Sequence, residues 1–218
     1  MAKSESTISQ KVLNVWAISL ILWSFYRFTF TTSQPVWVDE FIAKPLLFLL
    51  PLFWYVTKSE KQPFLKGIGV EAKHIWTNIF MGVGVGGLFL LLAFLVRFLK
   101  GGTLPHLVLS TSSLVWVLAM VAAGTTEQVL STGFVFKRLH EESKKIIQPV
   151  ITSAFLFFFL HIPVLLGTAK IIPSVVIQTM ALNIVLSVIT SVLYLLRKST
   201  IPAIVAHLLF FLSLPLLV

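Results

Sequence analysis

Seven apolar stretches dominate the sequence, and each has close to the ~20 residues that a helix needs to cross the hydrocarbon core of a membrane. They cover approximately residues 12–28, 41–57, 75–99, 113–136, 147–166, 171–196 and 201–218. Hydrophobic residues make up 57% of the chain and charged residues 11%, a composition that is typical of membrane proteins. The sequence therefore predicts an all-α, polytopic membrane helical bundle of about seven transmembrane helices.

The 17 Lys and Arg residues are divided unevenly between the two sides of this predicted bundle. The side opposite the N-terminus receives five of them, namely Arg27, Lys44, Arg97, Lys100 and Lys170, which leaves twelve on the N-terminal side. Because cytoplasmic connections carry the excess of positive charge, we expect a multi-pass protein of the cell membrane with a cytoplasmic N-terminus. The same distribution accounts for the net charge of +9, so a nucleic-acid partner is not expected.

Two features limit the possible chemistry and packing. The chain has no cysteine, which excludes disulfides, thiol catalysis and cysteine metal ligands. Within the third stretch, Gly82, Gly84 and Gly87 formally match G-x-G-x-x-G, but that fingerprint needs a strand before it and a helix after it. Gly82 and Gly86 also form G-x-x-x-G, a pattern of closely approaching membrane helices. We therefore expect helix packing here and not nucleotide binding.

The second stretch contains Lys44, Pro45 and Pro51, which leaves open whether it crosses the membrane or lies partly in the interface. In the fourth stretch, Glu127 is the one acidic residue of eight that we place inside an apolar span, with Asp39, Glu40 and the remaining acids in tails or connections. An ionisable group at membrane depth costs at least a few kcal/mol, so Glu127 is a candidate functional residue that needs a partner.

His161 and His207 are the candidate partners of Glu127, since both lie inside apolar stretches. At about 1.5 Å of rise per residue, the three groups lie at a similar depth in the cytoplasmic half of the membrane. A carboxylate and two imidazoles can activate a water molecule for hydrolysis, or hold a divalent metal such as Zn with one position open. Alternatively, a histidine in a membrane helix can form a hydrogen bond that joins two helices, and this applies to His161 and His207 as well.

Three short motifs resemble those of one membrane protease family. Residues 127–134 read EQVLSTGF, residues 157–161 read FFFLH and residues 201–207 read IPAIVAH. They are similar to the motifs E-E-x-x-x-R-G, F-x-x-x-H and H-x-x-x-N of the CPBP family, the CAAX-protease and bacteriocin-processing proteins also called the Abi family. The similarity runs from about residue 67 to the end, which implies membrane anchor helices in 1–66 and a protease core in 67–218.

The resemblance implies a role for each matched residue. Glu127 corresponds to the carboxylate that activates water, His161 to its partner, and His207 to the group that polarises the scissile carbonyl. Phe157 corresponds to a packing residue of the second motif. The site is expected to open towards the cytoplasm and to act on a peptide or lipidated protein substrate. Whether a metal takes part is left open.

The chain departs from the family pattern at three positions. Gln128 replaces the second Glu, Thr132 replaces the Arg and Phe211 replaces the Asn. Positions 128 and 132 are one helical turn apart, so a neutral pair can replace an ion pair as a unit. Asn183 and Gln178 are the polar residues of the sixth stretch that could replace the missing Asn.

These observations favour an intramembrane endopeptidase that cleaves prenylated proteins or peptides with Glu/His-activated water. The three departures support an alternative, a weak or inactive relative that acts in binding or in bacteriocin self-immunity. An ion- or proton-coupled transporter would also keep a carboxylate and histidines in the membrane. Against transport, the chain shows no matching pair of interrupted helices in two halves.

Overall fold

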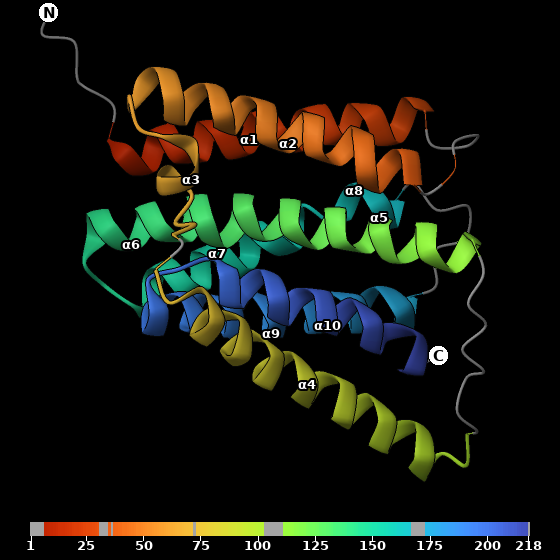
Figure 1. Ribbon diagram of the computed structural model, residues 1–218. Helices are drawn as coiled ribbons and strands as arrows, with labels where there is room; N and C mark the ends of the chain where they lie inside the picture. The colour runs from red at the N-terminus through yellow and green to blue at the C-terminus, as the bar shows by residue number, and fades with distance from the viewer. Residues whose placement is uncertain are drawn as a thin grey trace, which may run out of the picture.

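The computed structural model describes residues 7–30, 35, 37–71, 73–102, 111–166 and 173–217, and every regular element in these ranges is helical. Long helices lie side by side in a bundle, with shorter pieces at their ends (Figure 1). The three segments named η are π-helical and continue a neighbouring α-helix. In chain order the elements are α1 Ile8–Phe30, η1 Val38–Ala43, α2 Lys44–Trp54, η2 Tyr55–Ser59, α3 Phe64–Gly67, α4 Ile75–Leu99, α5 Thr111–Gln128, η3 Val129–Phe136, α6 Lys137–Ser143, α7 Ile147–Phe159, α8 Ile162–Leu166, α9 Pro173–Arg197 and α10 Ile201–Leu217.

The predicted fold class, a polytopic helical bundle, is confirmed. Among the described residues, α10 is the one predicted span that falls short, because its apolar part, Ile201–Leu214, is shorter than the other candidates. The second predicted stretch forms one continuous helical segment in which η1, α2 and η2 follow each other directly. Six helical segments are long and apolar enough to cross a membrane, namely Ile8–Phe30, Val38–Ser59, Ile75–Leu99, Leu114–Ser143, Ile147–Leu166 and Val176–Arg197.

Two acidic residues that the sequence assigned to a connection lie inside this second helical segment, so that assignment was wrong. Asp39 and Glu40 belong to η1, and Asp39 is buried. Arg27 of α1 donates to Asp39 at 2.6 Å, and Lys44 of α2 forms an ion pair with Glu40. A buried carboxylate that is paired with a cation avoids most of the cost of an isolated buried charge. The helix can therefore continue through both acids.

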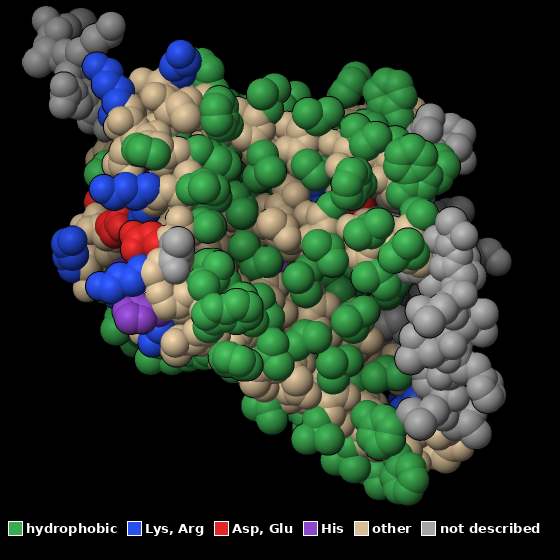
Figure 2. Space-filling view, viewed as in Figure 1, with side chains coloured by type: hydrophobic (Ala, Val, Ile, Leu, Met, Phe, Trp, Pro, Cys, Tyr) green, Lys and Arg blue, Asp and Glu red, His purple; other side chains and the backbone are tan. Residues whose placement is uncertain are grey.

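The outer surface of the bundle is apolar over its length and charged at one end. Many large hydrophobic side chains are exposed, and Figure 2 shows them over the flanks of the helices, as expected for surfaces that face lipid. Lys, Arg, Asp and Glu side chains gather at the end of the molecule near α6 (Figure 2). Glu141 and Glu142, which the sequence also assigned to a connection, are part of α6, which extends the helix of the fourth span beyond its predicted end.

Close packing of α4 against α10 confirms the prediction made from Gly82 and Gly86. A Cβ atom added at Gly82 would lie 2.8 Å from the backbone oxygen of Pro202, and one added at Gly86 would lie 3.1 Å from the Cα of Ala206. At Gly84, which faces away, an added Cβ would meet no atom within 4 Å. The two buried glycines therefore let the helix backbones approach each other.

We expect Gly82→Ala to lower the free energy of unfolding by about 1–3 kcal/mol, because the added methyl group overpacks the contact between α4 and α10. Gly84→Ala is the matched control on the same helix. It should be neutral or stabilising by up to about 1 kcal/mol, since alanine is the better helix former and its methyl group meets open space. Chemical unfolding in detergent measures both changes, and equal effects of the two variants would contradict the packing assigned to Gly82.

Candidate active site

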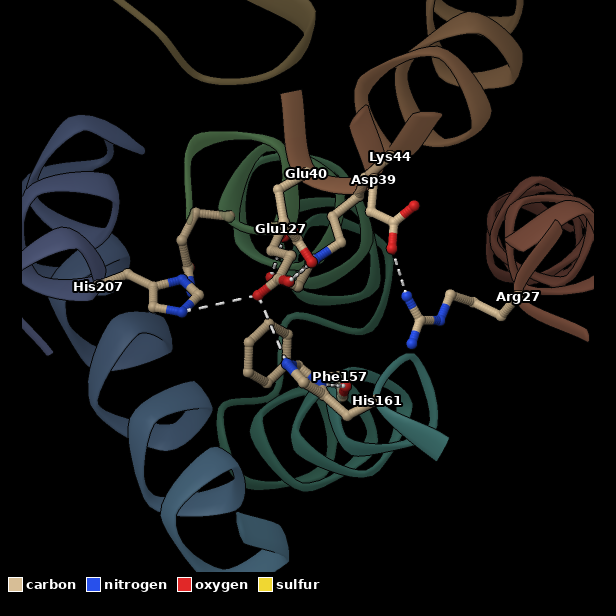
Figure 3. A network of polar contacts seen from close by, with 10 residues as sticks. Arg27, Asp39, Glu40, Lys44, Glu127, Phe157, His161 and His207 are labelled. Carbon is tan, nitrogen blue, oxygen red and sulfur yellow. Dashed lines mark hydrogen bonds and ion pairs between the residues drawn. The ribbon is translucent and has the colours of Figure 1, made fainter. Parts of the chain in front are cut away.

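Glu127 lies in the last turn of α5, immediately before η3, and its side chain is 3% exposed. Its Oε2 atom faces two histidines from other helices, at 3.5 Å from His161 Nε2 and 3.6 Å from His207 Nε2 (Figure 3). These separations are longer than an ordinary hydrogen bond, so Glu127 Oε2 remains able to accept a hydrogen bond from another group. The structure thus brings together the three residues that the sequence singled out.

His161 follows the end of α7, where the chain turns into α8. Its Nδ1 atom lies 3.0 Å from the backbone oxygen of Phe157. Because a carbonyl oxygen can only accept a hydrogen bond, Nδ1 must carry a hydrogen, and the neutral ring then has its lone pair on Nε2. His161 therefore presents a hydrogen-bond acceptor towards Glu127.

His207, in α10, is fully buried. The hydrogen and the lone pair of its ring are on the opposite nitrogens to those in His161. The Nδ1 atom of His207 lies 3.1 Å from Gln128 Nε2, and the Thr132 hydroxyl donates to Gln128 Oε1 at 2.7 Å. The Gln128 amide therefore donates to Nδ1, and the hydrogen of the neutral ring lies on Nε2, which faces the Glu127 carboxylate. The contact between positions 128 and 132 confirms that they lie against each other, one turn apart.

Phenylalanine rings fix the orientation of both imidazoles. Phe157 is fully buried, and its ring centroid lies 4.9 Å from that of His161 and 5.8 Å from that of His207. Its predicted packing role is therefore confirmed. Phe211 also packs on His207, with the two ring centroids 4.3 Å apart. His207 thus contacts two aromatic side chains and the amide of Gln128.

Lys44 is a member of this cluster that the sequence analysis did not assign to the site. Its ammonium group lies 2.8 Å from Glu127 Oε1, and both side chains are almost fully buried. Glu40 also pairs with this ammonium (Figure 3). The centroid of the Trp23 ring lies 5.3 Å from it. A charged residue inside an apolar stretch was the signal that identified Glu127, and the same criterion applied to the second stretch would have found Lys44.

The two carboxylate oxygens of Glu127 therefore have different environments. Oε1 is bound by the Lys44 ammonium, whereas Oε2 is free of direct hydrogen bonds and faces His161 and His207. The described residues contain no group of three or more His, Cys, Asp and Glu side chains arranged to hold a metal ion. A metal ion would also add a second cation beside a carboxylate that Lys44 already neutralises. This donor set therefore fits the binding of water better than that of a metal.

A small cavity of about 110 Å³ adjoins the cluster. It is lined by His161, by Asn183 of α9 and by apolar side chains of α9 and α10, including Phe211. Asn183 therefore reaches the site region, whereas the side chain of Gln178, the other candidate in the sixth stretch, is exposed. The expected opening of the site towards the cytoplasm stays a prediction.

Residues 109–212 match the family described as type II CAAX prenyl endopeptidase Rce1-like. This segment is similar to CAAX proteases. The family predicted from the three motifs is thus confirmed, and the matched segment contains Glu127, His161 and His207. Lys44 lies outside the matched segment, in the N-terminal part of the chain. No curated protein matches the sequence.

Proposed function

We propose that the protein is an intramembrane endopeptidase that hydrolyses a peptide bond of a prenylated protein or peptide. The observation that carries this proposal is the convergence of Glu127 Oε2 with two imidazole nitrogens of opposite hydrogen-bonding character. His161 presents an acceptor and His207 a donor. Hydrolysis needs both, because water must lose a proton while the carbonyl oxygen gains negative charge.

The proposed reaction begins with a water molecule that donates hydrogen bonds to Glu127 Oε2 and His161 Nε2. Glu127 takes one proton as the water oxygen forms a bond to the scissile carbonyl carbon. His207 Nε2–H donates to the carbonyl oxygen as it becomes negative. The carbon–nitrogen bond then breaks, and the proton held by Glu127 passes to the leaving amine, with His161 orienting the transfer. The products are a carboxylic acid and an amine, and Glu127 is again ionised.

The proposed substrate class is supported by the family description and by the apolar flanks of the bundle. The family description names CAAX prenyl endopeptidases, which supports a substrate with an isoprenylated cysteine followed by two aliphatic residues and a terminal residue. A prenyl chain partitions into the membrane, and the apolar flanks of the bundle would lie in the same layer. The cell membrane and the cytoplasmic N-terminus also stay proposals, supported by the distribution of Lys and Arg.

A second candidate function, peptide binding without cleavage, is supported by Phe211. This ring packs on His207 at the position where the family pattern has Asn. An apolar ring cannot donate a hydrogen bond to a developing oxyanion. A weak or inactive relative would bind the same substrate class and release it intact.

Glu127→Gln should lower the rate of cleavage of a farnesylated C-a-a-X peptide by at least about a thousandfold, because the amide cannot accept the proton of water. Purified protein in detergent is incubated with the peptide, and the products are identified by mass spectrometry. Glu141→Gln, an exposed residue of α6, is the matched control and should cleave at the wild-type rate. A chelator should leave the rate unchanged. Cleavage by Glu127→Gln at the wild-type rate would rule out this base, and uncleaved peptide that is bound by the wild type would favour the second candidate.

A further inference from the structure

We propose that Lys44 is a positioning residue of the site, because its ammonium group holds the Glu127 carboxylate away from His207. Both reacting groups are thereby kept free for water and the scissile carbonyl. This inference rests on the proposed function, since it concerns the same reacting groups. It also gives the N-terminal part of the chain, which lies outside the matched segment 109–212, a part in the reaction.

Two atoms of the site face each other without forming a hydrogen bond. Glu127 Oε2 and His207 Nε2 are both buried, and neither has a hydrogen-bond partner among the residues that the structure describes. They lie 3.6 Å apart, and Nε2 carries a hydrogen while Oε2 is an acceptor. Buried polar groups nearly always form the hydrogen bonds within their reach, because an unsatisfied buried group is costly. Another contact must therefore hold this donor and this acceptor apart.

The Lys44 ammonium makes that contact. It donates to the other carboxylate oxygen, Glu127 Oε1, at 2.8 Å. Figure 3 shows the ammonium and the His207 ring on different sides of the carboxylate. A hydrogen bond between two charged groups is about twice as strong as one between neutral groups, and both side chains are almost fully buried. A movement of Oε2 towards His207 would turn the carboxylate and lengthen this bond.

The position of Lys44 is itself fixed by contacts other than Glu127. Glu40, one turn earlier, pairs with the same ammonium, and the centroid of the Trp23 ring of α1 lies 5.3 Å from it. An ammonium group has three N–H donors, so it can bind both carboxylates at once. Phe48, one turn further along α2, is buried in the same hydrophobic cluster as Leu130 of η3. The ammonium therefore stays in place and cannot follow the carboxylate towards His207.

The separation of Glu127 from His207 serves both steps of the proposed reaction. Oε2 is free to accept a proton from the attacking water. His207 Nε2–H is free to donate to the carbonyl oxygen as that oxygen becomes negative. A direct hydrogen bond between the two residues would occupy the base and the donor together. Loss of Lys44 should therefore lower kcat and change KM little, since the reacting groups and not the substrate contacts are disturbed.

The test uses the full-length protein in detergent and the farnesylated C-a-a-X peptide. Lys44→Met is combined with Glu40→Gln, so that one cation and one anion are removed and the net charge of the cluster with Glu127 stays the same. Relative to Glu40→Gln alone, the double variant should lower kcat by about a hundredfold, the effect of misplacing a reacting group by about 1 Å. KM should change little. A kcat equal to that of Glu40→Gln would overturn the positioning role of Lys44.

A second ion pair provides the matched control for loss of stability. Arg138 Nε donates to Glu60 Oε1 at 2.6 Å, and both side chains are largely buried at the charged end of the bundle. Glu60→Gln combined with Arg138→Met should lower the melting temperature and keep the wild-type kcat, because neither residue contacts Glu127. If this control lowered kcat as much as the variant at positions 40 and 44, lost stability would be the cause and the positioning role would be overturned.

NMR of protein with isotope-labelled histidine provides a readout that does not depend on cleavage. The Nε2–H signal of His207 is assigned by its absence in His207→Gln. In the double variant at positions 40 and 44 this signal should shift downfield, because Glu127 can then accept the hydrogen directly. An unchanged signal would overturn the positioning role. If the wild type cleaves no peptide but the signal shifts, the proposed function fails while the positioning of Glu127 by Lys44 stands.

Discussion

Lys44→Met is expected to lower the free energy of unfolding by about 3–5 kcal/mol, because it leaves two carboxylates without their buried cation. The ammonium of Lys44 contacts Glu127 Oε1 at 2.8 Å and also pairs with Glu40. Methionine has a similar length and an apolar side chain like the lysine stem, so the main change is the loss of the ammonium charge, together with its contact to the Trp23 ring. Chemical unfolding in detergent measures the difference between the variant and the wild type.

Two further variants separate the charge of Lys44 from its packing. Lys58→Met, on the exposed surface of η2, is the matched control and should change stability by less than about 0.5 kcal/mol. Lys44→Met combined with Glu127→Gln removes both partners of the pair, so the double variant should be more stable than the sum of the single changes predicts. Wild-type stability in Lys44→Met would mean that the ammonium does not neutralise Glu127.

The spans and the three site residues could be predicted because each leaves a local pattern in the sequence. A run of about 20 apolar residues is sufficient to predict a membrane helix. A carboxylate within such a run stands out, and Glu127, His161 and His207 were expected at similar depths from their positions along helices. The structure places the two histidines within 3.6 Å of Glu127.

The pairing of Lys44 with Glu127 could not be predicted in the same way, because the two residues lie in distant parts of the chain. A charge near the start of an apolar run is ordinarily interpreted as a connection, since burial of an unpaired charge is costly. Here the partner of Lys44 is 83 residues away, in another helix. Sequence spacing cannot reveal such a pair, and neither can it show which ring nitrogen of each histidine carries the hydrogen.

The contact between Gln128 and Thr132 could be predicted from the sequence, but its effect on His207 could not. Their spacing predicted contact, and the 2.7 Å hydrogen bond between them confirms it. The consequence for His207 emerges only from the structure, because Gln128 donates to its Nδ1 atom. A glutamate at this position would accept a hydrogen from Nδ1 and leave a lone pair on Nε2, facing the Glu127 carboxylate.

Gln128→Glu is therefore expected to be damaging on its own, as it adds a buried carboxylate close to Glu127 and reverses the hydrogen position on His207. Thr132→Arg alone should lower the free energy of unfolding by about 3–5 kcal/mol, because it buries a cation without a partner. The double variant restores a paired charge one turn apart, as in the family pattern. It should be more stable than the sum of the two single changes predicts.

A double-mutant cycle on the free energy of unfolding measures this coupling. Gln148 and Thr152 form a matched control pair, since they have the same residue types and the same spacing on α7, and the Gln148 side chain is exposed. Gln148→Glu with Thr152→Arg should couple by about 0.2–0.5 kcal/mol, the value of a solvated pair at this spacing. For the buried pair the coupling should exceed about 1 kcal/mol, because water screens neither charge. Equal coupling in the two cycles would mean that positions 128 and 132 do not share a buried environment, and the tautomer assigned to His207 would lose its support.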